Sequence, residues 1–385
     1  MSAHAHSKTR ILVVAGETSG DIHTARLINQ MKKLGQFEFF GIGGDLMAKE
    51  GVDLLFHVND MSFMGFFEVI KHLPFIKKVF TSILQSVKER NPDIVILTDY
   101  PGFNLRLAKA VKKLNIPVIY FISPQVWAWG KRRIKKIVKN VDKMLVILPF
   151  EEDLYRQKNL DTEFVGHPLK DAYEGNFNKK DFLTSIDLDP AKPVLALLPG
   201  SRKQEVSKLL EPMLQSYNIL KQTHPELQAV VAGAPHVPRD LYPEQPGKSI
   251  KIIFNQTNAI INACDAVVVA SGTATLECAI ALKPMVVVYK LSTISYLIGK
   301  AVIKLDKIAL VNIVAGKKIV PELIQNEATP RNIAEQAGKM LFDSERILTV
   351  KNELQNVSSL LGSEGASKRA AGSIIRFIEN RINRQ

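Results

Sequence analysis

Residues 266–277 read AVVVASGTATLE, and this stretch decides the fold class of the chain. An apolar run typical of a buried strand in a parallel sheet is followed at once by a turn of small residues and then by the start of a helix. Small side chains at such a turn have two explanations, which are tight packing of the helix on the sheet and room for an anion at the helix N-terminus. This stretch taken alone leaves both open.

The same order of strand, glycine-containing turn and helix recurs along the chain. Apolar segments of strand length alternate with segments of helical period, which predicts parallel βαβ units and the α/β class. Strands are expected at 10–16, 37–44, 93–101, 116–124 and 143–149, and again at 193–202, 227–235, 250–254, 266–272 and 284–290. Two such sets predict two Rossmann-like domains facing a cleft, with C-terminal helices, and sites in the turns after the strands.

Composition sets the expected domain boundaries. Polar residues and turn formers predict a linker at 169–192, between an N-terminal domain at 1–168 and a second domain at 193–345. The last segment, 346–385, is expected to form helices that pack on the N-terminal domain or on a partner subunit.

The charge balance indicates the kind of partner. The 385 residues carry a formal net charge of +13, which favours nucleic acid, phosphorylated substrates or acidic lipid headgroups. Cys264 and Cys278 lack metal-ligand or redox spacing, so they are expected to be reduced core residues of a cytosolic protein. The sequence also predicts neither a secretory signal nor a membrane-spanning segment.

Two turns in the second half suit a phosphate. In PGSR at 199–202, Gly200 lets the backbone approach a ligand, Ser201 can cap the next helix, and Arg202 carries a planar fork of donors. The alternative there is a capped helix with a solvated arginine. In the turn of 266–277, main-chain N–H groups and hydroxyls offer an anion site, and Glu277 can accept the hydroxyls of a ribose.

Two turns in the first half carry carboxylates. AGETSGD at 15–21 lacks GxGxxG, and Glu17 and Asp21 would repel a pyrophosphate, so this turn suits a neutral sugar or an acceptor hydroxyl. Ser19 or Asp21 as a helix N-cap is compatible with that interpretation. Asp99 ends an apolar strand, where a raised pKa would make it a general base. Asn104 is expected to cap the following helix.

Two segments combine apolar and basic residues. Residues 121–143 join Trp127 and Trp129 to six lysines and arginines, which favours contact with phosphates or lipid headgroups over a solvated helix face. Residues 61–80 place phenylalanines and methionines beside cations. This second segment is either a docking surface for acyl chains or a buried core helix.

The motifs AGETSGD, GIGGDLM, MGFFEVI, ISPQVWAW, FVGHPL, LLPGSR, ASGTATLE and NIVAGKKIVPELIQ occur in one order along nearly the whole chain. This ordered set resembles the lipid-A-disaccharide synthase family, glycosyltransferases of the two-Rossmann-domain (GT-B) type. The resemblance implies transfer of 2,3-diacylglucosamine from its UDP derivative to the 6-hydroxyl of 2,3-diacylglucosamine 1-phosphate, releasing UDP, in the lipid A biosynthesis of Gram-negative bacteria.

The resemblance also implies the partners and the location. These are the UDP-diacylglucosamine donor, the diacylglucosamine 1-phosphate acceptor and an anionic membrane surface, with no nucleic acid and neither a metal nor another cofactor. The enzyme would be cytoplasmic and peripherally associated with the inner membrane. The basic C-terminal helix permits a homodimer contact.

Residue roles carry over by position. The resemblance implies that Asp99 is the base that deprotonates the acceptor hydroxyl and that Arg202 neutralises the departing UDP phosphates. Glu17 and Ser19 would face the substrate from the first domain. The residues implied to line or close the nucleotide site are Ser201, Arg202, Ser271, Gly272, Thr273, Thr275, Glu277, Asn312, Glu322 and Gln325.

The chain departs from the family pattern in two places. Tyr100 and Gly102 stand where the family commonly has Ala and Asp, and Ile22, His23 and Thr24 replace a smaller Leu-Gly turn. These departures affect the expected fit of the acceptor more than the chemistry. A UDP-N-acetylglucosamine 2-epimerase or a transferase with another lipid acceptor is the nearest alternative. A basic nucleic-acid or membrane-binding protein is the non-enzymatic one, and the absence of a P-loop argues against a P-loop ATPase.

Overall fold

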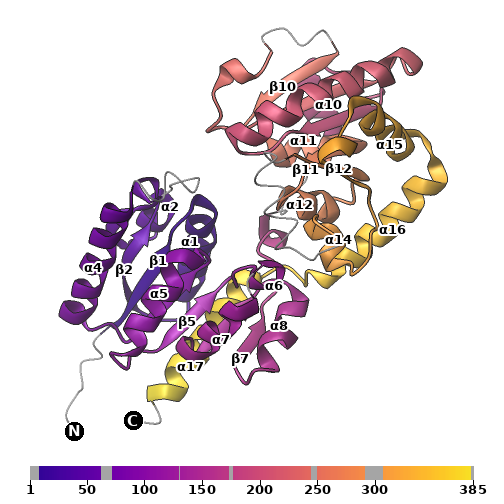
Figure 1. Ribbon diagram of the computed structural model, residues 1–385. Helices are drawn as coiled ribbons and strands as arrows, with labels where there is room; N and C mark the ends of the chain where they lie inside the picture. Colours follow the sequence, from indigo (N-terminus) through magenta and orange to yellow (C-terminus); the bar gives the residue numbers. More distant parts are fainter. Residues whose placement is uncertain are drawn as a thin grey trace. The chain divides into compact units, whose positions relative to one another are not determined.

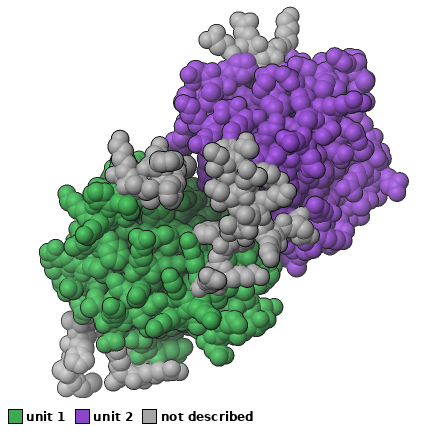
Figure 2. Space-filling view, in the orientation of Figure 1, with its two compact units in different colours: residues 1–172, 361–385 green, residues 173–360 purple. Residues whose placement is uncertain are grey.

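A computed structural model describes residues 8–61, 72–129, 131–172, 177–243, 249–290 and 307–382. The chain divides into two compact units, Met1–Ala172 with Leu361–Gln385 and Tyr173–Leu360 (Figure 2). The chain therefore leaves the first unit, builds the second, and returns to complete the first.

The first unit is built on a seven-stranded sheet in the order β3-β2-β1-β4-β5-β6-β7 (Figure 1). Every neighbouring pair of strands is parallel, so all carboxyl ends lie at one edge. The strands are β1 (Thr9–Ala15), β2 (Phe37–Gly43), β3 (Asp53–His57), β4 (Ile94–Thr98), β5 (Val118–Phe121), β6 (Lys143–Val146) and β7 (Asp161–Phe164).

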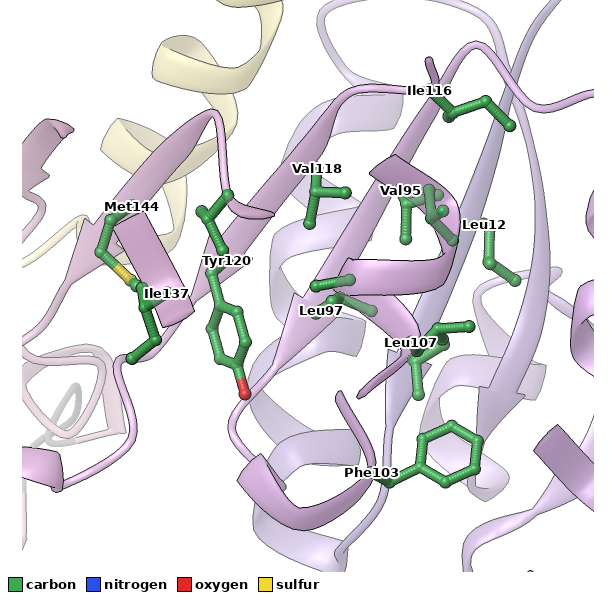
Figure 3. Close-up of a cluster of buried hydrophobic side chains, with 14 of the residues drawn as sticks. Leu12, Val95, Leu97, Phe103, Leu107, Ile116, Val118, Tyr120, Ile137 and Met144 are labelled. Atoms are coloured by element: carbon green, nitrogen blue, oxygen red, sulfur yellow. The ribbon is translucent and has the colours of Figure 1, made fainter. Parts of the chain in front are cut away.

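Helices cover both faces of this sheet. They are α1 (Thr18–Lys32), α2 (Asp45–Lys49), α4 (Leu73–Arg90), α5 (Pro101–Lys112), α6 (Val126–Trp129), α7 (Lys131–Asn140), α8 (Pro149–Arg156) and α17 (Ala366–Ile382), with short 3-10 turns η1 (Val58–Asp60) and η2 (Lys170–Ala172). Alternate residues of β1 point to opposite faces: Leu12 joins a cluster with α4, α5 and α7 (Figure 3), and Ile11 joins one with α1 and α17.

The second unit is built on a six-stranded parallel sheet in the order β10-β9-β8-β11-β12-β13. Its strands are β8 (Val194–Leu198), β9 (Gln228–Gly233), β10 (Ile250–Phe254), β11 (Ala266–Ala270), β12 (Met285–Tyr289) and β13 (Glu322–Ile324). Its helices are α9 (Lys179–Ser185), α10 (Lys203–Thr223), α11 (Thr257–Ala263), α12 (Ala274–Ile280), α14 (Leu310–Val314), α15 (Pro330–Phe342) and α16 (Ser344–Leu360), with 3-10 turns η3 (Arg239–Leu241) and η4 (Gln325–Glu327).

The α/β class, the two parallel sheets and the C-terminal helices are confirmed. The sequence did not predict β3, β7 and β13, which are all edge strands. Helix α9 lies within 169–192, the expected linker, and packs on α11 of the second unit. Helix α17 packs on α1, where Ala370, Ala371 and Ile374 complete the apolar core of the first unit.

Two further expectations concern the core and the membrane. Cys264 and Cys278 are buried free thiols, as predicted. Among the described residues, no helix has the length and apolar character needed to cross a membrane. Residues 62–71, the main part of the predicted acyl-chain surface, lie outside the described residues.

Candidate functional site

A cavity of about 410 Å³ lies at the carboxyl edge of the second sheet. Because β8 and β11 are neighbours in this sheet, the turns that follow them lie side by side. Six of the residues predicted from the sequence line the cavity together: Ser201, Arg202, Ser271, Gly272, Thr273 and Glu277. The structure thus brings the PGSR turn and the ASGTATLE turn to one site.

The PGSR turn is closed by a carboxylate. Gly200 has φ +115°, a backbone conformation that favours glycine, and a Cβ there would lie 2.3 Å from Glu205 Oε2. The same oxygen accepts hydrogen bonds from the backbone N–H groups of Ser201 (3.0 Å) and Arg202 (3.3 Å). The N-cap of α10 is Arg202, so the prediction that Ser201 caps this helix is wrong. Glu205 supplies the acceptor that the serine hydroxyl was expected to provide.

The Arg202 side chain remains available to a ligand. Its Nη1 lies 3.8 Å from Glu205 Oε1, and the side chain is 60% exposed. An ion pair of this length and exposure contributes little to stability. Because Glu205 occupies the backbone N–H groups of Ser201 and Arg202, the guanidinium is the charged donor of PGSR that can meet an anion.

The turn at 271–274 has open space in front of it. A Cβ on Gly272 would meet no atom within 4 Å, so tight packing does not account for this glycine. Thr275 is fully buried, and its hydroxyl donates to the Gly272 carbonyl at 2.8 Å, which places it behind the cavity lining. Glu277 lines the cavity, and burial raises its pKa. Of the two explanations for the small residues, the geometry at Gly272 favours room for a ligand.

Asn312 and Glu322 form a partly buried network and are not among the residues that line the cavity. Glu322 accepts hydrogen bonds from the N–H groups of Ile308 and Ala309, each at 3.0 Å, and from Asn312 Nδ2 at 2.8 Å. Asn312 is fully buried and binds the main chain at residues 319–320. Gln325 starts η4, with φ +53°. A hydrogen bond connects the network to the cavity: Ser271 Oγ donates to the Ile308 carbonyl at 3.4 Å.

In the first unit, Asp99 directly follows β4 at the carboxyl edge. Asp99 and Tyr100 both have left-handed backbones, with φ +44° and +46°. Burial, reinforced by the negative charge of Glu17, raises the pKa of Asp99 from 3.8 to about 6. A carboxyl group with such a pKa is ionised near neutral pH and can still take up a proton, which suits a general base.

The helix after Asp99 begins differently from the prediction. The N-cap of α5 is Tyr100, and Asn104 lies inside the helix, so the prediction that Asn104 is the cap is wrong. Its Nδ2 instead reaches back to the carbonyls of Thr98 and Asp99, at 3.1 and 2.9 Å. Asn104 thus fastens the turn to the helix.

The AGETSGD turn places Glu17 and Ser19 on the surface, and Glu17 is the N-cap of α1. The prediction that Ser19 or Asp21 caps this helix is therefore wrong. Asp21 is buried, and its carboxylate holds the N-terminus of α2, because its Oδ1 accepts from the N–H groups of Gly44 (2.7 Å) and Met47 (3.1 Å).

Two of the residues that depart from the family pattern are also placed by the structure. The Thr24 hydroxyl lies in hydrogen-bond contact with the Thr98 hydroxyl at 2.7 Å. Burial lowers the pKa of His23 to about 4.

The aromatic and basic segment splits into two roles. Trp127 is partly buried, and its Nε1–H donates to the buried Glu151 at 3.1 Å, so a hydrogen bond anchors this tryptophan to α8. Helix α7 buries Ile134 and Ile137 and exposes Lys135, Lys136 and Lys139, which makes it an amphipathic basic helix. The side chain of Trp129 lies outside the described residues.

The sequence did not single out several residues that line the cavity, among them Glu205, Pro235 and Thr257. Glu205 is one turn into α10, Pro235 follows β9, and Thr257 starts α11. The strand-end rule would have found Pro235, because β9 ends in GAP at the same edge. Within the described ranges, no three His, Cys, Asp or Glu side chains come together as a metal site requires.

Comparison with known sequences identifies close relatives. The family model described as Lipid-A-disaccharide synthetase matches residues 11–375. The lipid-A-disaccharide synthase of Syntrophus aciditrophicus is 43% identical over 374 residues, covering 96% of this chain and 98% of that protein. The synthase of Trichlorobacter lovleyi is 41% identical over 374 residues, with the same coverage of 96% and 98%.

Solved structures share the fold at low identity. UDP-GlcNAc 2-epimerase from Neisseria meningitidis, bound to UDP-GlcNAc, has a TM-score of 0.67 at 13% identity, covering 95% of this chain and 100% of that chain. The kitacinnamycin glycosyltransferase has a TM-score of 0.66 at 16% identity, covering 96% and 99%. Transferases and epimerases thus share this architecture, and the fold does not distinguish them. The sequence relatives distinguish the two activities, because both are named lipid-A-disaccharide synthases.

Proposed function

The chain belongs to the lipid-A-disaccharide synthase family, and from that premise we propose which of its residues bind the donor and which perform the transfer. The activity of the family is a glycosyl transfer that forms the lipid A disaccharide, from a UDP-sugar donor and a phosphorylated sugar acceptor. We propose that donor and acceptor are UDP-2,3-diacylglucosamine and 2,3-diacylglucosamine 1-phosphate.

The donor's UDP occupies the cavity of the second unit in this proposal. The Arg202 guanidinium faces the diphosphate, and the turn at 271–274 lies against it. Glu277 accepts the ribose hydroxyls. The observation that carries the assignment is the meeting of the two turns at one cavity, with open space in front of Gly272. Phosphate binding by such strand-to-helix turns is the usual arrangement in α/β folds.

The remaining predicted residues take supporting roles. Asn312 and Glu322 hold the segment behind the Ser271 turn and so shape the site without touching UDP. Gln325, at the start of η4, is proposed to close the nucleotide site. Thr275 supports the same turn from within the core. Glu17 and Ser19 are exposed at the edge that carries Asp99, where they suit contacts with acceptor hydroxyls.

Asp99 acts as the base in this proposal. Its carboxylate takes the proton of the acceptor 6-hydroxyl while the oxygen attacks the anomeric carbon, and the bond from that carbon to the UDP oxygen breaks. Arg202 stabilises the charge that develops on the leaving diphosphate. One displacement with one base inverts the anomeric configuration, which yields the β-1,6 linkage. These steps involve only side chains of the protein and the two substrates.

Contact with an anionic membrane surface is proposed for α7. Its exposed Lys135, Lys136 and Lys139 present cations to lipid headgroups, while its apolar side packs in the core. An acylated acceptor resides in such a surface. A homodimer and a location at the cytoplasmic face of the inner membrane stay predictions.

The proposed substrates are tested by direct conversion. The purified chain is incubated with the UDP-diacylglucosamine donor and the phosphorylated acceptor, and the disaccharide 1-phosphate is detected by mass. The expected result is one disaccharide and one UDP per turnover. UDP-N-acetylglucosamine without acyl chains serves as the control donor, and conversion of that donor to its 2-epimer, without disaccharide, would overturn the proposal.

A further inference from the structure

The turn that carries Asp99 adopts an unfavourable backbone conformation. Asp99 and Tyr100 are consecutive residues with side chains, and both have positive φ. Left-handed backbone is unfavourable for most residues with a Cβ, less so for Asp than for Tyr, and two such residues in succession persist only where the surroundings hold them. The contacts that hold this turn are therefore part of the design of the site.

Two buried side chains donate to the main chain of this turn. The Tyr120 hydroxyl donates to the Asp99 carbonyl at 2.5 Å, and Asn104 Nδ2 donates to the same carbonyl at 2.9 Å. Both residues are fully buried. Tyr120 belongs to β5, where it pairs in register with Leu97 of β4, and its ring lies in the apolar cluster of Figure 3.

The two donors belong to different elements and meet at the same carbonyl oxygen. One is fixed by the neighbouring strand and the other by the helix that the turn begins, and the N–H of Asp99 adds a bond to the Phe121 carbonyl at 3.3 Å. Rotation of the peptide after Asp99 would break both side-chain bonds and leave buried donors without partners, which is costly in a dry core.

We infer that Tyr120 and Asn104 are positioning residues, which hold the backbone of Asp99 so that its carboxylate meets the acceptor hydroxyl. The inference rests on the proposed role of Asp99 as the base. Both side chains donate hydrogen bonds to the backbone carbonyl of Asp99. Their effect on the reaction comes from the direction that the left-handed turn gives to the Asp99 side chain.

Tyr120→Phe tests the inference, because it removes one hydroxyl and keeps the ring in the core. We expect kcat to fall about 10- to 100-fold, the size of effect that a small misplacement of a reacting group produces, with both KM values nearly unchanged. We also expect the acidic limb of kcat/KM to move to lower pH. The groups that raise or lower the Asp99 pKa are Glu17, Tyr100 and the burial of the carboxyl, and a relaxed turn exposes that carboxyl to water.

Tyr217→Phe is the matched control. Tyr217 is a buried tyrosine of the second unit whose hydroxyl donates to the Leu227 carbonyl at 3.0 Å, so its loss has a comparable effect on stability. A purely structural role for Tyr120 predicts equal changes in Tm and in kcat for the two variants, and that result would overturn the inference. Asn104→Ser is the second variant and should lower kcat in the same way as Tyr120→Phe.

Asp99→Asn, measured in parallel, distinguishes failure of the proposed base from failure of the positioning role of Tyr120 and Asn104. If Asp99→Asn keeps the full rate, the proposed base is wrong and the inference fails with it. If Asp99→Asn is inactive while Tyr120→Phe and Asn104→Ser keep the full kcat and the same pH profile, the base stands and the positioning role is wrong.

Discussion

The ring of Tyr100 lies directly on Gly16: a Cβ built on Gly16 would come within 2.2 Å of the ring carbons. Gly16 directly follows β1 and Tyr100 follows Asp99, so this contact fixes the distance between the AGETSGD turn and the turn of the proposed base. The Tyr100 hydroxyl is tied in addition to the Met61 carbonyl at 3.2 Å. The ring therefore cannot move without disturbing both turns.

Gly16→Ala is expected to lower activity and stability together. The new methyl group displaces the Tyr100 ring, and overpacking of this kind destabilises a protein by about 1–3 kcal/mol. Urea unfolding and the rate of disaccharide formation measure the two effects. Gly102→Ala is the control, because a Cβ there meets nothing within 4 Å. In this variant the free energy of unfolding should rise, since a Gly→Ala change in a helix stabilises the fold by up to about 1 kcal/mol. Equal behaviour of both variants would show that the contact is irrelevant.

The pH dependence of kcat/KM should follow Asp99. A base works when ionised, and a pKa raised to about 6 means that activity is lost as pH falls through 6 rather than through 3.8. Glu17→Gln removes the negative charge that contributes to this shift, so the acidic limb should move to lower pH. Burial is the larger cause, and the limb should therefore stay above 3.8. A limb that moves to higher pH in Glu17→Gln would contradict the assignment.

Arg202→Ala should weaken UDP binding and lower kcat with little effect on stability. The 3.8 Å ion pair with Glu205 is largely exposed, and such pairs contribute about 0–1 kcal/mol. Loss of one group that stabilises a developing charge costs about 10²- to 10³-fold in kcat. Isothermal titration with UDP and steady-state kinetics measure both effects. Lys203→Ala removes the adjacent exposed cation and is the control; an unchanged UDP affinity in Arg202→Ala would exclude the phosphate role.

Glu322→Ala should act through the fold of the second unit. The carboxylate accepts bonds from Ile308, Ala309 and Asn312, and leaving such donors unpaired costs about 1–3 kcal/mol each when they are buried. The expected result is a lower Tm and a weaker UDP affinity, through the link from Ile308 to Ser271. Glu327→Ala, at the neighbouring exposed turn, is the control. Direct contact of Glu322 with UDP predicts the opposite pattern, with lost affinity at an unchanged Tm.

The sequence predicted the central strands and the strand-end turns, because their apolar runs and small residues carry a strong local signal. The strands it missed lie at sheet edges, where DTEF of β7 is polar and β13 has three residues. Polar or very short edge strands such as β7 and β13 lack the apolar run that identifies a central strand, whereas β3 carries the run LLF, which was not recognised.

The helix caps were the least predictable part of the site. Ser201, Ser19 and Asn104 have the side chains that usually cap helices, yet the caps are Arg202, Glu17 and Tyr100. In two of these cases a competing local contact decides: Glu205 takes the donors beside Ser201, and Asn104 binds the Asp99 turn. Local preference identifies where a helix starts within a few residues and leaves the cap itself to its surroundings.

The central claim is that Asp99 is the base, and the rate of disaccharide formation by Asp99→Asn tests it most directly. The amide keeps the size of the side chain and cannot accept the proton. For Asp99→Asn we expect a kcat lower by about 10²- to 10⁴-fold and an unchanged affinity for UDP. Asp93→Asn, at the opposite end of β4, where Asp93 accepts the Arg10 N–H at 2.7 Å, should keep its rate. A full rate in Asp99→Asn would contradict the account.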